Sequence, residues 1–259
     1  MTVGLDGFAK FASSLADISG PVIREHFRTP FEVDAKADLS PVTIADRDAE
    51  KALRKRIEET YPDHGIIGEE FGNVREDASH LWVLDPIDGT KAFITGLPVF
   101  GTLIALAIDG APVVGIIDQP ISRERWVGVK GEPTRFNGKV VQTRARNTLG
   151  EAALYATHPD MFDQENDREK FNLLSDSVGL TRFGGDCYSY GLLASGHIDL
   201  VVEAKLQLYD FMALIPVVEG AGGVACDWQG NALGKHSDGH MLAAANERLR
   251  DLALDHLSV

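Results

Sequence analysis

The sequence predicts a mixed α+β and α/β protein, in which two layered halves face each other across a cleft. In residues 1–145, long apolar runs and tight-turn signals indicate helices packed on a sheet with antiparallel pairs. In residues 146–259, strand-like and helix-like patterns alternate, as they do in α/β units. The length of 259 residues and the hydrophobic fraction of 44% allow a substantial core, in one large domain or two packed halves.

The N-terminal half, residues 1–145, begins with two amphipathic helices. Apolar residues at helical spacing predict a helix over residues 5–27, which Gly20-Pro21 should kink or interrupt. A second helix is expected to begin after Thr43 and to end near Tyr61. Asp109-Gly110, between two apolar runs, predicts a β-hairpin. Strands are expected at residues 31–35, 66–70, 81–84, 100–108, 112–117 and 125–129, followed by a turn at 137–138.

The C-terminal half, residues 146–259, continues as alternating short segments. Pro216 falls inside one of its helical patterns, and a glycine-rich stretch at 220–223 follows that pattern. Strands are expected at residues 152–156, 181–183, 198–202, 224–227 and 241–245. Helices are expected at residues 165–177, 187–195, 209–219 and 247–257.

The composition limits which partners the protein is expected to bind and in which compartment it is expected. A formal net charge of -14 repels phosphate backbones, so nucleic-acid binding is not expected. No apolar run reaches the roughly 18 residues of a membrane span, and the first residues lack a signal-peptide pattern. Two cysteines, Cys187 and Cys226, are too few for a disulfide framework. We therefore expect a cytoplasmic protein that binds no membrane.

One stretch, residues 81–90, organises the rest of the chain. Four apolar residues predict a strand buried on both faces, and Asp85 and Asp88 follow it three residues apart. Pro86 biases Asp85 toward an extended conformation, and Gly89 permits a sharp bend. We expect the two carboxylates and the carbonyl of Ile87 to point at one place.

The same stretch offers groups for a cation and for an anion. Thr90 is expected to N-cap a short helix that begins near Lys91. Oxygen ligands suit a hard cation such as Mg²⁺, and a helix N-terminus suits a phosphate. The alternative is an ordinary surface turn of the Asp-Pro-x-Asp-Gly type. We favour the metal site, because the apolar run places the turn at the edge of a core. On so acidic a protein, bound divalent cations would also reverse the local field that a phosphate meets.

Further acids are expected beside this stretch. Glu69 and Glu70 end a short strand that should lie near the strand of Asp85, although such a pair alone is usually a solvated turn. Asp210 lies in an apolar context at a helix start, where a simple N-cap is the alternative to metal ligation. Carboxylates this close would raise one another's pKa unless cations lay between them.

Taken together, these motifs resemble those of the inositol monophosphatase superfamily of Mg²⁺-dependent phosphatases, over essentially the whole chain and in the same order. The resemblance is carried by Gly68-Glu69-Glu70, by residues 82–90, by Tyr209-Asp210 with residues 219–223, and by Lys36, Asp38, Thr43 and Asp46 upstream. Tyr209 stands where the family usually has Trp. This difference leaves the metal ligand Asp210 in place but changes a residue expected at the pocket wall. The resemblance implies a layered αβαβα sandwich of the sugar-phosphatase type.

The resemblance also implies two or three Mg²⁺ ions in one active site. It assigns Glu69, Asp85 and the Ile87 carbonyl to one ion, Asp85, Asp88 and Asp210 to a second, and Glu70 to a weaker third ion and its water. Mn²⁺ stays open as the ion, because both metals accept oxygen ligands. The N-terminal half would thus carry the metal motifs, and the C-terminal half one metal ligand.

The phosphate and the attacking water are implied in the same way. Asp88, Gly89 and Thr90 would surround the phosphate, with the amides of Gly89 and Thr90 in contact with it. Asp46 and Thr90 would orient the water, so the implied catalytic residues are Asp46, Glu70 and Thr90. Metal ions lower the pKa of bound water and stabilise phosphoryl transfer, so no nucleophilic Ser or Cys is required.

The substrate side lies in the C-terminal half. Gly184 and Gly185 allow close approach before Asp186, which is either a helix N-cap or an acid at the pocket rim. Glu203, seven residues before Asp210, matches the family position that contacts the leaving alcohol. Two acids suit a cationic leaving group. The Gly-Gly-Asp-Cys-Tyr run with residues 93–102 and 117–126 most resembles the histidinol-phosphate phosphatase branch, which implies L-histidinol phosphate as substrate.

Other functions stay open on the sequence. Inositol-1-phosphate hydrolysis by the same residues is the nearest alternative, and hydrolysis of a nucleotide 3'-phosphate is less favoured by the acidic composition. From another class, the chain could be a metal-binding regulatory module without turnover. We expect a homodimer, which is common among such phosphatases, and whether the second subunit enters the pocket stays open.

Overall fold

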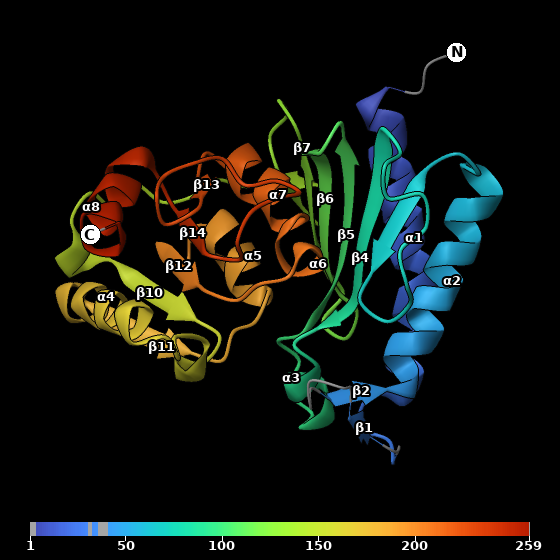
Figure 1. Ribbon diagram of the computed structural model, residues 1–259, viewed down its shortest axis with the longest axis horizontal. Helices are drawn as coiled ribbons and strands as arrows, with labels where there is room; N and C mark the ends of the chain where they lie inside the picture. Colours follow the sequence, from blue (N-terminus) through green and yellow to red (C-terminus); the bar gives the residue numbers. More distant parts are fainter. Residues whose placement is uncertain (1–3, 31–32, 36–40, 259) are drawn as a thin grey trace.

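The two larger of three β-sheets alternate with three layers of helices, in the order helix, sheet, helix, sheet, helix (Figure 1). The computed structural model describes residues 4–30, 33–35 and 41–258. One outer layer is formed by α1 (Leu5–His26) and α2 (Ile44–Thr60), and the other by α4 (Glu165–Ser177) and α8 (Glu247–Leu257). Between the sheets lie α5 (Tyr188–Ala194), α6 (Leu208–Phe211) and α7 (Leu214–Gly220). The predicted αβαβα fold class is confirmed.

The larger sheet comes from the N-terminal half and is mostly antiparallel. Its strand order is β3-β4-β5-β6-β7-β8-β9, in which only the β3–β4 pair is parallel. The hairpin turn expected at Asp109-Gly110 is present, and both residues have positive φ, 50° and 81°. The strands are β3 (Gly65–Gly68), β4 (His80–Asp88), β5 (Gly101–Ile108), β6 (Ala111–Gln119), β7 (Glu124–Val129), β8 (Arg135–Phe136) and β9 (Lys139–Val140).

The smaller sheet comes from the C-terminal half and is mixed. Its order is β11-β10-β12-β14-β13, with β10 parallel to both of its neighbours and β14 antiparallel to both of its own. The strands are β10 (Ala153–Ala156), β11 (Leu180–Phe183), β12 (Leu200–Glu203), β13 (Val224–Cys226) and β14 (Met241–Ala244). The remaining elements are β1 (Val33–Ala35), β2 (Pro41–Thr43), α3 (Thr90–Ile94) and the 3₁₀ turns η1 (Leu149–Glu151) and η2 (Pro159–Met161). Phe31, which we expected in the first strand, and Lys36 and Asp38 of the upstream motif lie outside the described residues.

Close packing in the middle layer positions α6 and α7 on the large sheet. A Cβ atom at Gly115 of β6 would lie 2.0 Å from the carbonyl oxygen of Ala213, just before α7. A Cβ atom at Gly128 of β7 would lie 2.3 Å from the carbonyl oxygen of Pro216. These glycines let the helix backbone touch the sheet. They thereby hold α7 against the sheet, and two residues separate α7 from α6, which carries Asp210.

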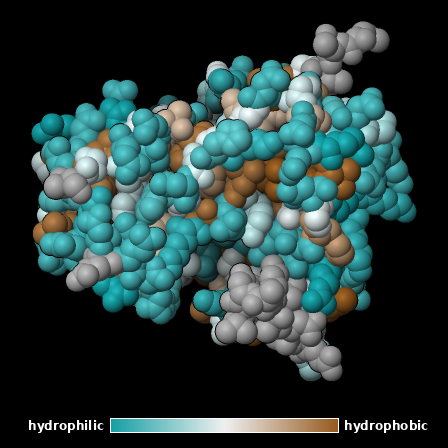
Figure 2. Space-filling model, viewed as in Figure 1, coloured by the Kyte–Doolittle hydropathy of each residue, from teal (hydrophilic) through white to brown (hydrophobic). Residues whose placement is uncertain are grey.

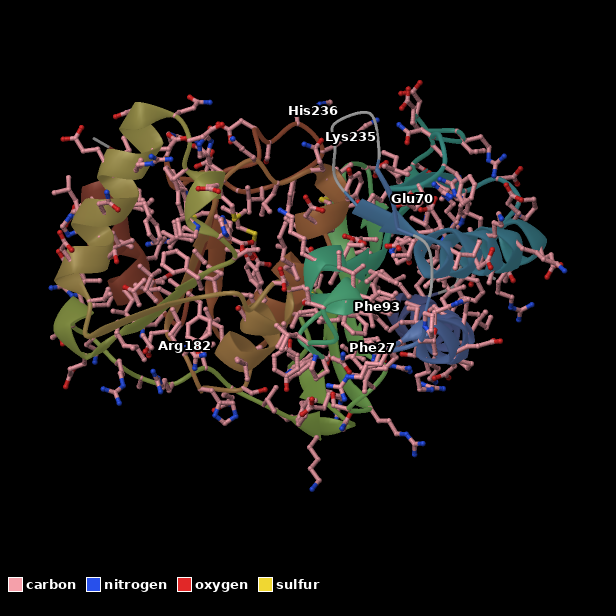
Figure 3. The ribbon with its side chains drawn as sticks, turned by 90° about the horizontal axis from the view of Figure 1, so that it is seen from below. Phe27, Glu70, Phe93, Arg182, Lys235 and His236 are labelled. Carbon is pink, nitrogen blue, oxygen red and sulfur yellow. The ribbon has the colours of Figure 1, made fainter. Side chains whose placement is uncertain are left out.

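The short helix α3 is anchored by a cluster of three aromatic rings, one of which is its own. Phe27, which follows α1, and Phe93 of α3 lie side by side, with ring centroids 5.7 Å apart (Figure 3). Phe100 contacts both rings, at 5.4 Å and 5.1 Å. This cluster fixes the segment after Asp88, where the sequence predicts the phosphate site.

Two helix predictions were wrong in detail. α1 continues through Gly20-Pro21 without a break, so the missing donor of Pro21 does not interrupt it. The single helix expected at residues 209–219 is two helices, and the break falls at residues 212–213. Pro216 is then in the first turn of α7, where a missing N–H leaves no intrahelical bond unmade.

The outer surface is largely polar on the face that Figure 2 shows. The face in Figure 2 is mostly hydrophilic, with hydrophobic residues gathered in a band across its middle. Among the described residues, no helix is long and apolar enough to cross a membrane. The boundary expected between residues 145 and 146 stays a prediction, since one core cluster includes residues of both sheets and of the helices between them.

Candidate metal centre

A β-bulge at the end of β4 brings Asp85 and Asp88 to the same side of the large sheet. Asp85 pairs with Leu103 of β5 and Asp88 pairs with Gly101, so three steps on β4 oppose two on β5. Residues three apart in a regular strand point to opposite faces, and the extra residue of a bulge removes that difference. The Thr102 hydroxyl donates to the Pro86 carbonyl at 2.8 Å and holds the bulge.

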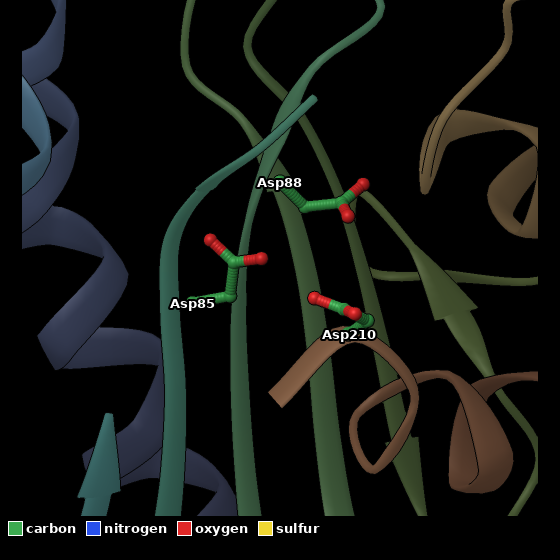
Figure 4. A group of neighbouring side chains, drawn as sticks. All are labelled: Asp85, Asp88 and Asp210. Atoms are coloured by element: carbon green, nitrogen blue, oxygen red, sulfur yellow. The ribbon is translucent and has the colours of Figure 1, made fainter. Parts of the chain in front are cut away.

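Asp210 completes a group of three carboxylates from two separate parts of the chain. One ligand oxygen of each of Asp85, Asp88 and Asp210 lies within 4.8 Å of the other two. Figure 4 shows the three side chains converging from β4 and α6 on a shared space. Asp210 also accepts a hydrogen bond from the backbone N of Gln207 at 2.6 Å, as the third residue of a capping box. It therefore caps its helix and also faces the other two acids.

The electrostatics of this group are unfavourable without a cation. Burial raises the pKa of Asp85 well above its usual value, and the negative charges of Glu69, Asp88 and Asp210 raise it further. Burial also raises the pKa of Asp88, as do the charges of Asp186 and Asp210. A divalent cation between them would favour the ionised carboxylates instead.

Asp46 and Glu69 lie beside this group. Asp46 is completely buried, and its Oδ2 accepts hydrogen bonds from the backbone N of Thr43 at 2.8 Å and its hydroxyl at 2.5 Å. Its Oδ1 has no hydrogen-bond partner among the described residues. Burial raises the pKa of Asp46 to about 6, and the charge of Glu69 adds to this effect. A buried, unsatisfied carboxylate oxygen calls for a ligand that the chain does not supply.

The oxygen donors of this cluster fit a hard divalent cation. Glu69, Asp85, Asp88 and Asp210 offer carboxylates, and Ile87 offers a carbonyl at the buried end of β4. Glu69 lines the same cavity as Asp88 and Asp210, and its backbone N donates to the Leu84 carbonyl at 3.2 Å. All-oxygen donors are typical of Mg²⁺ and Mn²⁺ sites. The roles assigned to these residues, and to Glu70, stay predictions.

The expected N-cap at Thr90 was wrong. α3 begins at Thr90 itself, and its N-cap is Gly89, in a left-handed conformation with φ of 87°. The Thr90 hydroxyl donates to the Ile87 carbonyl at 3.2 Å instead of accepting a backbone N–H. Only a residue such as glycine adopts the Gly89 conformation easily, so the helix starts one residue early.

A cavity of about 460 Å³ opens in front of these acids. Residues from both halves of the chain line it: Glu69, Asp88–Lys91, Thr157, His158, Asp160, Met161, Asp186, Glu203–Leu206 and Asp210. The predicted site residues that line this cavity are Glu69, Asp88, Gly89, Thr90, Asp186, Glu203 and Asp210. Gly184 and Gly185 precede Asp186 on the same loop, and a Cβ atom at Gly185 would lie 2.0 Å from the Ser189 hydroxyl.

Asp186 is packed against the predicted phosphate segment. A Cβ atom on Gly89 would lie 2.9 Å from the Asp186 side chain, so the two residues are in direct contact. Asp186 does not cap α5; that position belongs to Cys187, whose backbone N donates to Asp88 at 2.7 Å. Burial raises the pKa of Asp186 to about 6, and the nearby charge of Lys91 opposes the rise.

Glu203 forms a second acidic part of the cavity wall. It is 4% exposed at the end of β12, and burial raises its pKa to about 7. Its Oε1 accepts hydrogen bonds from the backbone N of Thr157 at 3.1 Å and from the Thr157 hydroxyl. Its Oε2 accepts a hydrogen bond from the Tyr190 hydroxyl at 2.8 Å. These bonds fix the carboxylate at the wall.

Several residues of the cavity were missed from the sequence. Lys91 follows the Asp-Pro-x-Asp-Gly-Thr run directly, so its position beside the motif was a usable signal. Thr157, His158 and Lys205 come from loops with no such motif, and their place depends on how β10 and β12 pair. Sequence spacing alone does not show this.

Comparisons with known proteins agree with the geometry. A family model described as the inositol monophosphatase family matches residues 5–258. The chloroplastic bifunctional phosphatase IMPL2 of Arabidopsis thaliana is 52% identical over 228 residues, 87% of this chain but only 66% of that protein. A histidinol-phosphatase of Chlorobaculum parvum is 34% identical over 241 residues, 93% of this chain and 92% of that protein. The solved structure of an inositol monophosphatase from Zymomonas mobilis matches with a TM-score of 0.91 and 50% identity, over 100% of both chains.

Proposed function

The chain belongs to the inositol monophosphatase family of phosphatases, and we propose that it hydrolyses L-histidinol phosphate to L-histidinol and phosphate with the help of Mg²⁺. The observation that carries the substrate proposal is a pair of acids, the half-buried Asp186 and the buried Glu203, on the wall of the cavity that Asp88 and Asp210 also line. Histidinol carries an ammonium group and an imidazole. Two carboxylates suit such a leaving group better than they suit a neutral polyol, because each can pair with a charge or a donor.

The protein's own residues would divide the reaction between them. Glu69, Asp85, Asp88 and Asp210 would hold the metal ions. When bound, divalent ions supply positive charge that polarises the phosphoryl group and lowers the pKa of a water. Asp46 Oδ1, which has no partner among the described residues, would accept a hydrogen bond from the attacking water. The Thr90 hydroxyl, which already donates to Ile87, can accept a second one from the same water.

The phosphate and the leaving group would occupy adjoining parts of the cavity. The phosphate would lie against Gly89 and Thr90, where an extra side chain has no room beside Asp186. The leaving alcohol would then face Asp186 and Glu203. An ammonium group at this place would replace part of the solvation that both acids lose by burial, and would lower their pKa again.

Inositol 1-phosphate is the second candidate substrate. The Zymomonas mobilis structure that is 50% identical to this chain carries the name inositol monophosphatase. Lys91 also lines the cavity, and its charge opposes the burial effect on Asp186. A lysine that already faces Asp186 would reduce the preference for a cationic leaving group. The acid pair and the named histidinol-phosphatase relative lead us to prefer histidinol phosphate.

The test is a comparison of kcat/KM on three phosphate esters in Mg²⁺: histidinol phosphate, inositol 1-phosphate and p-nitrophenyl phosphate. We expect histidinol phosphate to exceed inositol 1-phosphate by at least about tenfold, or roughly 1.4 kcal/mol. Asp186→Asn should lower the histidinol phosphate value about 10- to 100-fold, as expected for loss of a charged hydrogen bond. It should lower the p-nitrophenyl phosphate value much less.

Asp160→Asn is the matched control, because Asp160 lines the same cavity but is exposed. It should change none of the three values more than about twofold, as usual for a surface charge. Faster turnover of inositol 1-phosphate by the wild type would overturn the substrate proposal. Equal losses on all three esters in Asp186→Asn would show that this acid supports the metal site instead. No turnover of any ester would favour a metal-binding regulatory module.

Three expectations on partners and location stay part of the proposal. We propose a homodimer without nucleic-acid or membrane partners, in the cytoplasm. Light scattering of the purified protein after gel filtration tests the first of these, and a mass of one chain, 28.1 kDa, would contradict it.

A further inference from the structure

Glu50 of α2 is a completely buried acid that no motif singled out. Its Oε2 accepts a hydrogen bond from the backbone N of Glu70 at 2.8 Å, and its Oε1 accepts one from the backbone N of Phe71 at 3.2 Å. Arg54, one turn later in α2, donates its Nε to Oε1 at 2.6 Å. A buried carboxylate is stable only with such partners, so this one is committed to the turn after β3.

Arg54 holds the same turn from its other side. Its Nη2 donates to the carbonyl of Phe71 at 2.7 Å, so Glu50 and Arg54 together bind both polar backbone groups of that residue. The backbone of Gly68, at the end of β3, packs directly on this Glu50–Arg54 pair: a Cβ atom at Gly68 would lie 2.2 Å from Glu50 Oε1. The pair therefore contacts the chain on both sides of Glu69 and Glu70.

The turn is tied to the elements that carry the other predicted metal-site residues. The backbone N of Glu69 donates to the carbonyl of Leu84, next to Asp85 on β4. Asp46 lies four residues before Glu50, on the same face of α2. Glu50 thus connects the start of α2, the end of β3 and, through the turn, the end of β4.

We infer that Glu50, together with Arg54, is a positioning residue for the metal site. Side chains at Glu69 and Glu70 carry the same charge as Asp85, and their repulsion would push an unsupported turn outward before a cation binds. The backbone bonds to Glu50 oppose that movement, so the ligands are in place in advance. Glu50 itself is completely buried and touches no reacting group. This inference rests on the proposed metal-dependent function.

The test measures metal binding directly, without substrate. Glu50→Gln keeps the size of the side chain but replaces one acceptor oxygen with a donor, which then faces a backbone N–H or Arg54. We expect its Mn²⁺ dissociation constant, measured from the electron paramagnetic resonance signal of free Mn²⁺, to rise about 10- to 100-fold. The kcat at saturating Mg²⁺ should stay close to that of the wild type, because the ligands themselves are unchanged.

Asp199→Asn is the matched control, because Asp199 is equally buried and equally paired with an arginine but lies by the small sheet. It should lose stability and keep the wild-type Mn²⁺ affinity. Arg54→Lys is a second variant, which keeps the charge but loses the forked contact, and it should weaken Mn²⁺ binding less than Glu50→Gln. Circular dichroism shows whether each variant is folded. If Glu50→Gln does not fold, the Mn²⁺ affinity of Arg54→Lys is compared with that of the wild type instead.

The outcomes separate this inference from the function on which it rests. If the wild type binds Mn²⁺ and folded Glu50→Gln binds it equally well, Glu50 has no positioning role. The same holds if Asp199→Asn loses as much Mn²⁺ affinity as Glu50→Gln, because the effect would then follow stability alone. If the wild type binds no Mn²⁺, the proposed function itself fails.

Discussion

Two buried acids of this molecule, Asp199 and Asp85, have opposite surroundings. Asp199, beside the small sheet, is completely buried and accepts hydrogen bonds from both Arg144 Nε, at 2.7 Å, and Arg144 Nη2. It also accepts one from the backbone N of Ala153 at 2.7 Å. Asp85, on the large sheet, is 2% exposed, and its charged neighbours are other acids. The protein compensates one buried charge with its own cation and gathers the other with like charges.

The difference shows which acid serves the fold and which serves a ligand. A carboxylate with a cation and a backbone donor is satisfied without any ligand, so its role ends with structure. A cluster whose pKa values are raised costs stability at neutral pH, and that cost is removed only when a cation binds. Stability given up at one site and not at the other is a mark of function.

The largest expected effect comes from removing one charge of the cluster. Asp85→Asn keeps an oxygen that can accept from the Ile87 backbone N, which bonds Asp85 at 3.0 Å, but it loses a metal-binding charge. We expect kcat/KM to fall at least about 1000-fold, or roughly 4 kcal/mol. The folded pKa of Asp85 is raised, so its ionisation costs stability as pH rises through that value. The variant should therefore unfold at higher urea than the wild type at pH 8 in EDTA, and a lower midpoint would contradict the comparison.

The opposite result is expected for the compensated acid. Arg144→Met leaves Asp199 buried without its cation and should lower the free energy of unfolding by about 3 kcal/mol. Activity per folded molecule should not change, because Arg144 is not among the residues that line the cavity. Urea unfolding measures the first quantity. Arg146→Met is the matched control: the Arg146 side chain donates to the carbonyl of the exposed residue Glu151 at 3.0 Å, and its loss should cost less than about 0.5 kcal/mol.

Adding Mg²⁺ should reduce the difference in stability between the acid cluster, which lacks a cation of its own, and the Asp199 site, which has one. Mg²⁺ at about 100 times its dissociation constant should raise the stability of the wild type by about 2.7 kcal/mol, because it binds only the folded chain. Arg144→Met should show the same gain from a lower baseline, and Asp85→Asn a much smaller one. Thermal unfolding with and without Mg²⁺ gives these differences. An equal gain in Asp85→Asn would mean that the ion binds elsewhere.

The sequence predicted the acid cluster well because its residues lie in short, dense motifs. Asp85 and Asp88 follow a buried strand directly, and the order of apolar, Pro and Gly residues determines where their chain turns. The hairpin at Asp109-Gly110 was predicted for the same reason: two adjacent residues specify the turn. The αβαβα layering followed from the resemblance carried by these motifs.

What the sequence did not predict depends on contacts between distant segments. Glu50 looks like any polar residue of an amphipathic helix, and only the passage of β3 beside α2 makes it a backbone acceptor. The cavity-wall bonds of Thr157 and Tyr190 depend in the same way on where Glu203 lies. The break between α6 and α7 falls where Ala213 packs closely on Gly115 of β6, a contact that helical periodicity in the sequence does not reveal. Local pattern determines elements, whereas packing determines which side chains meet.

The smallest expected effect extends the comparison to a base. His64 accepts a hydrogen bond from Trp82 Nε1 at 3.1 Å and stacks on His80, with ring centroids 4.7 Å apart. Burial lowers the pKa of His64, and the charge of His80 lowers it further against the opposing charge of Asp63.

The sign of the pH effect follows from that lowered pKa. The unfolded chain binds a proton on His64 more readily than the folded one, so this contribution to stability is complete above the ordinary value of 6.5 and is lost as pH falls below it. His64→Gln keeps an acceptor for Trp82 and removes the titration, so it should lose less stability than the wild type between pH 7.5 and pH 5.5. Urea unfolding at both pH values tests this, with His197→Gln, an exposed histidine, as control. If His64→Gln and the wild type lose the same stability, the histidine is not held neutral by its surroundings. The contrast drawn from Asp85 and Asp199 would then apply to acids alone.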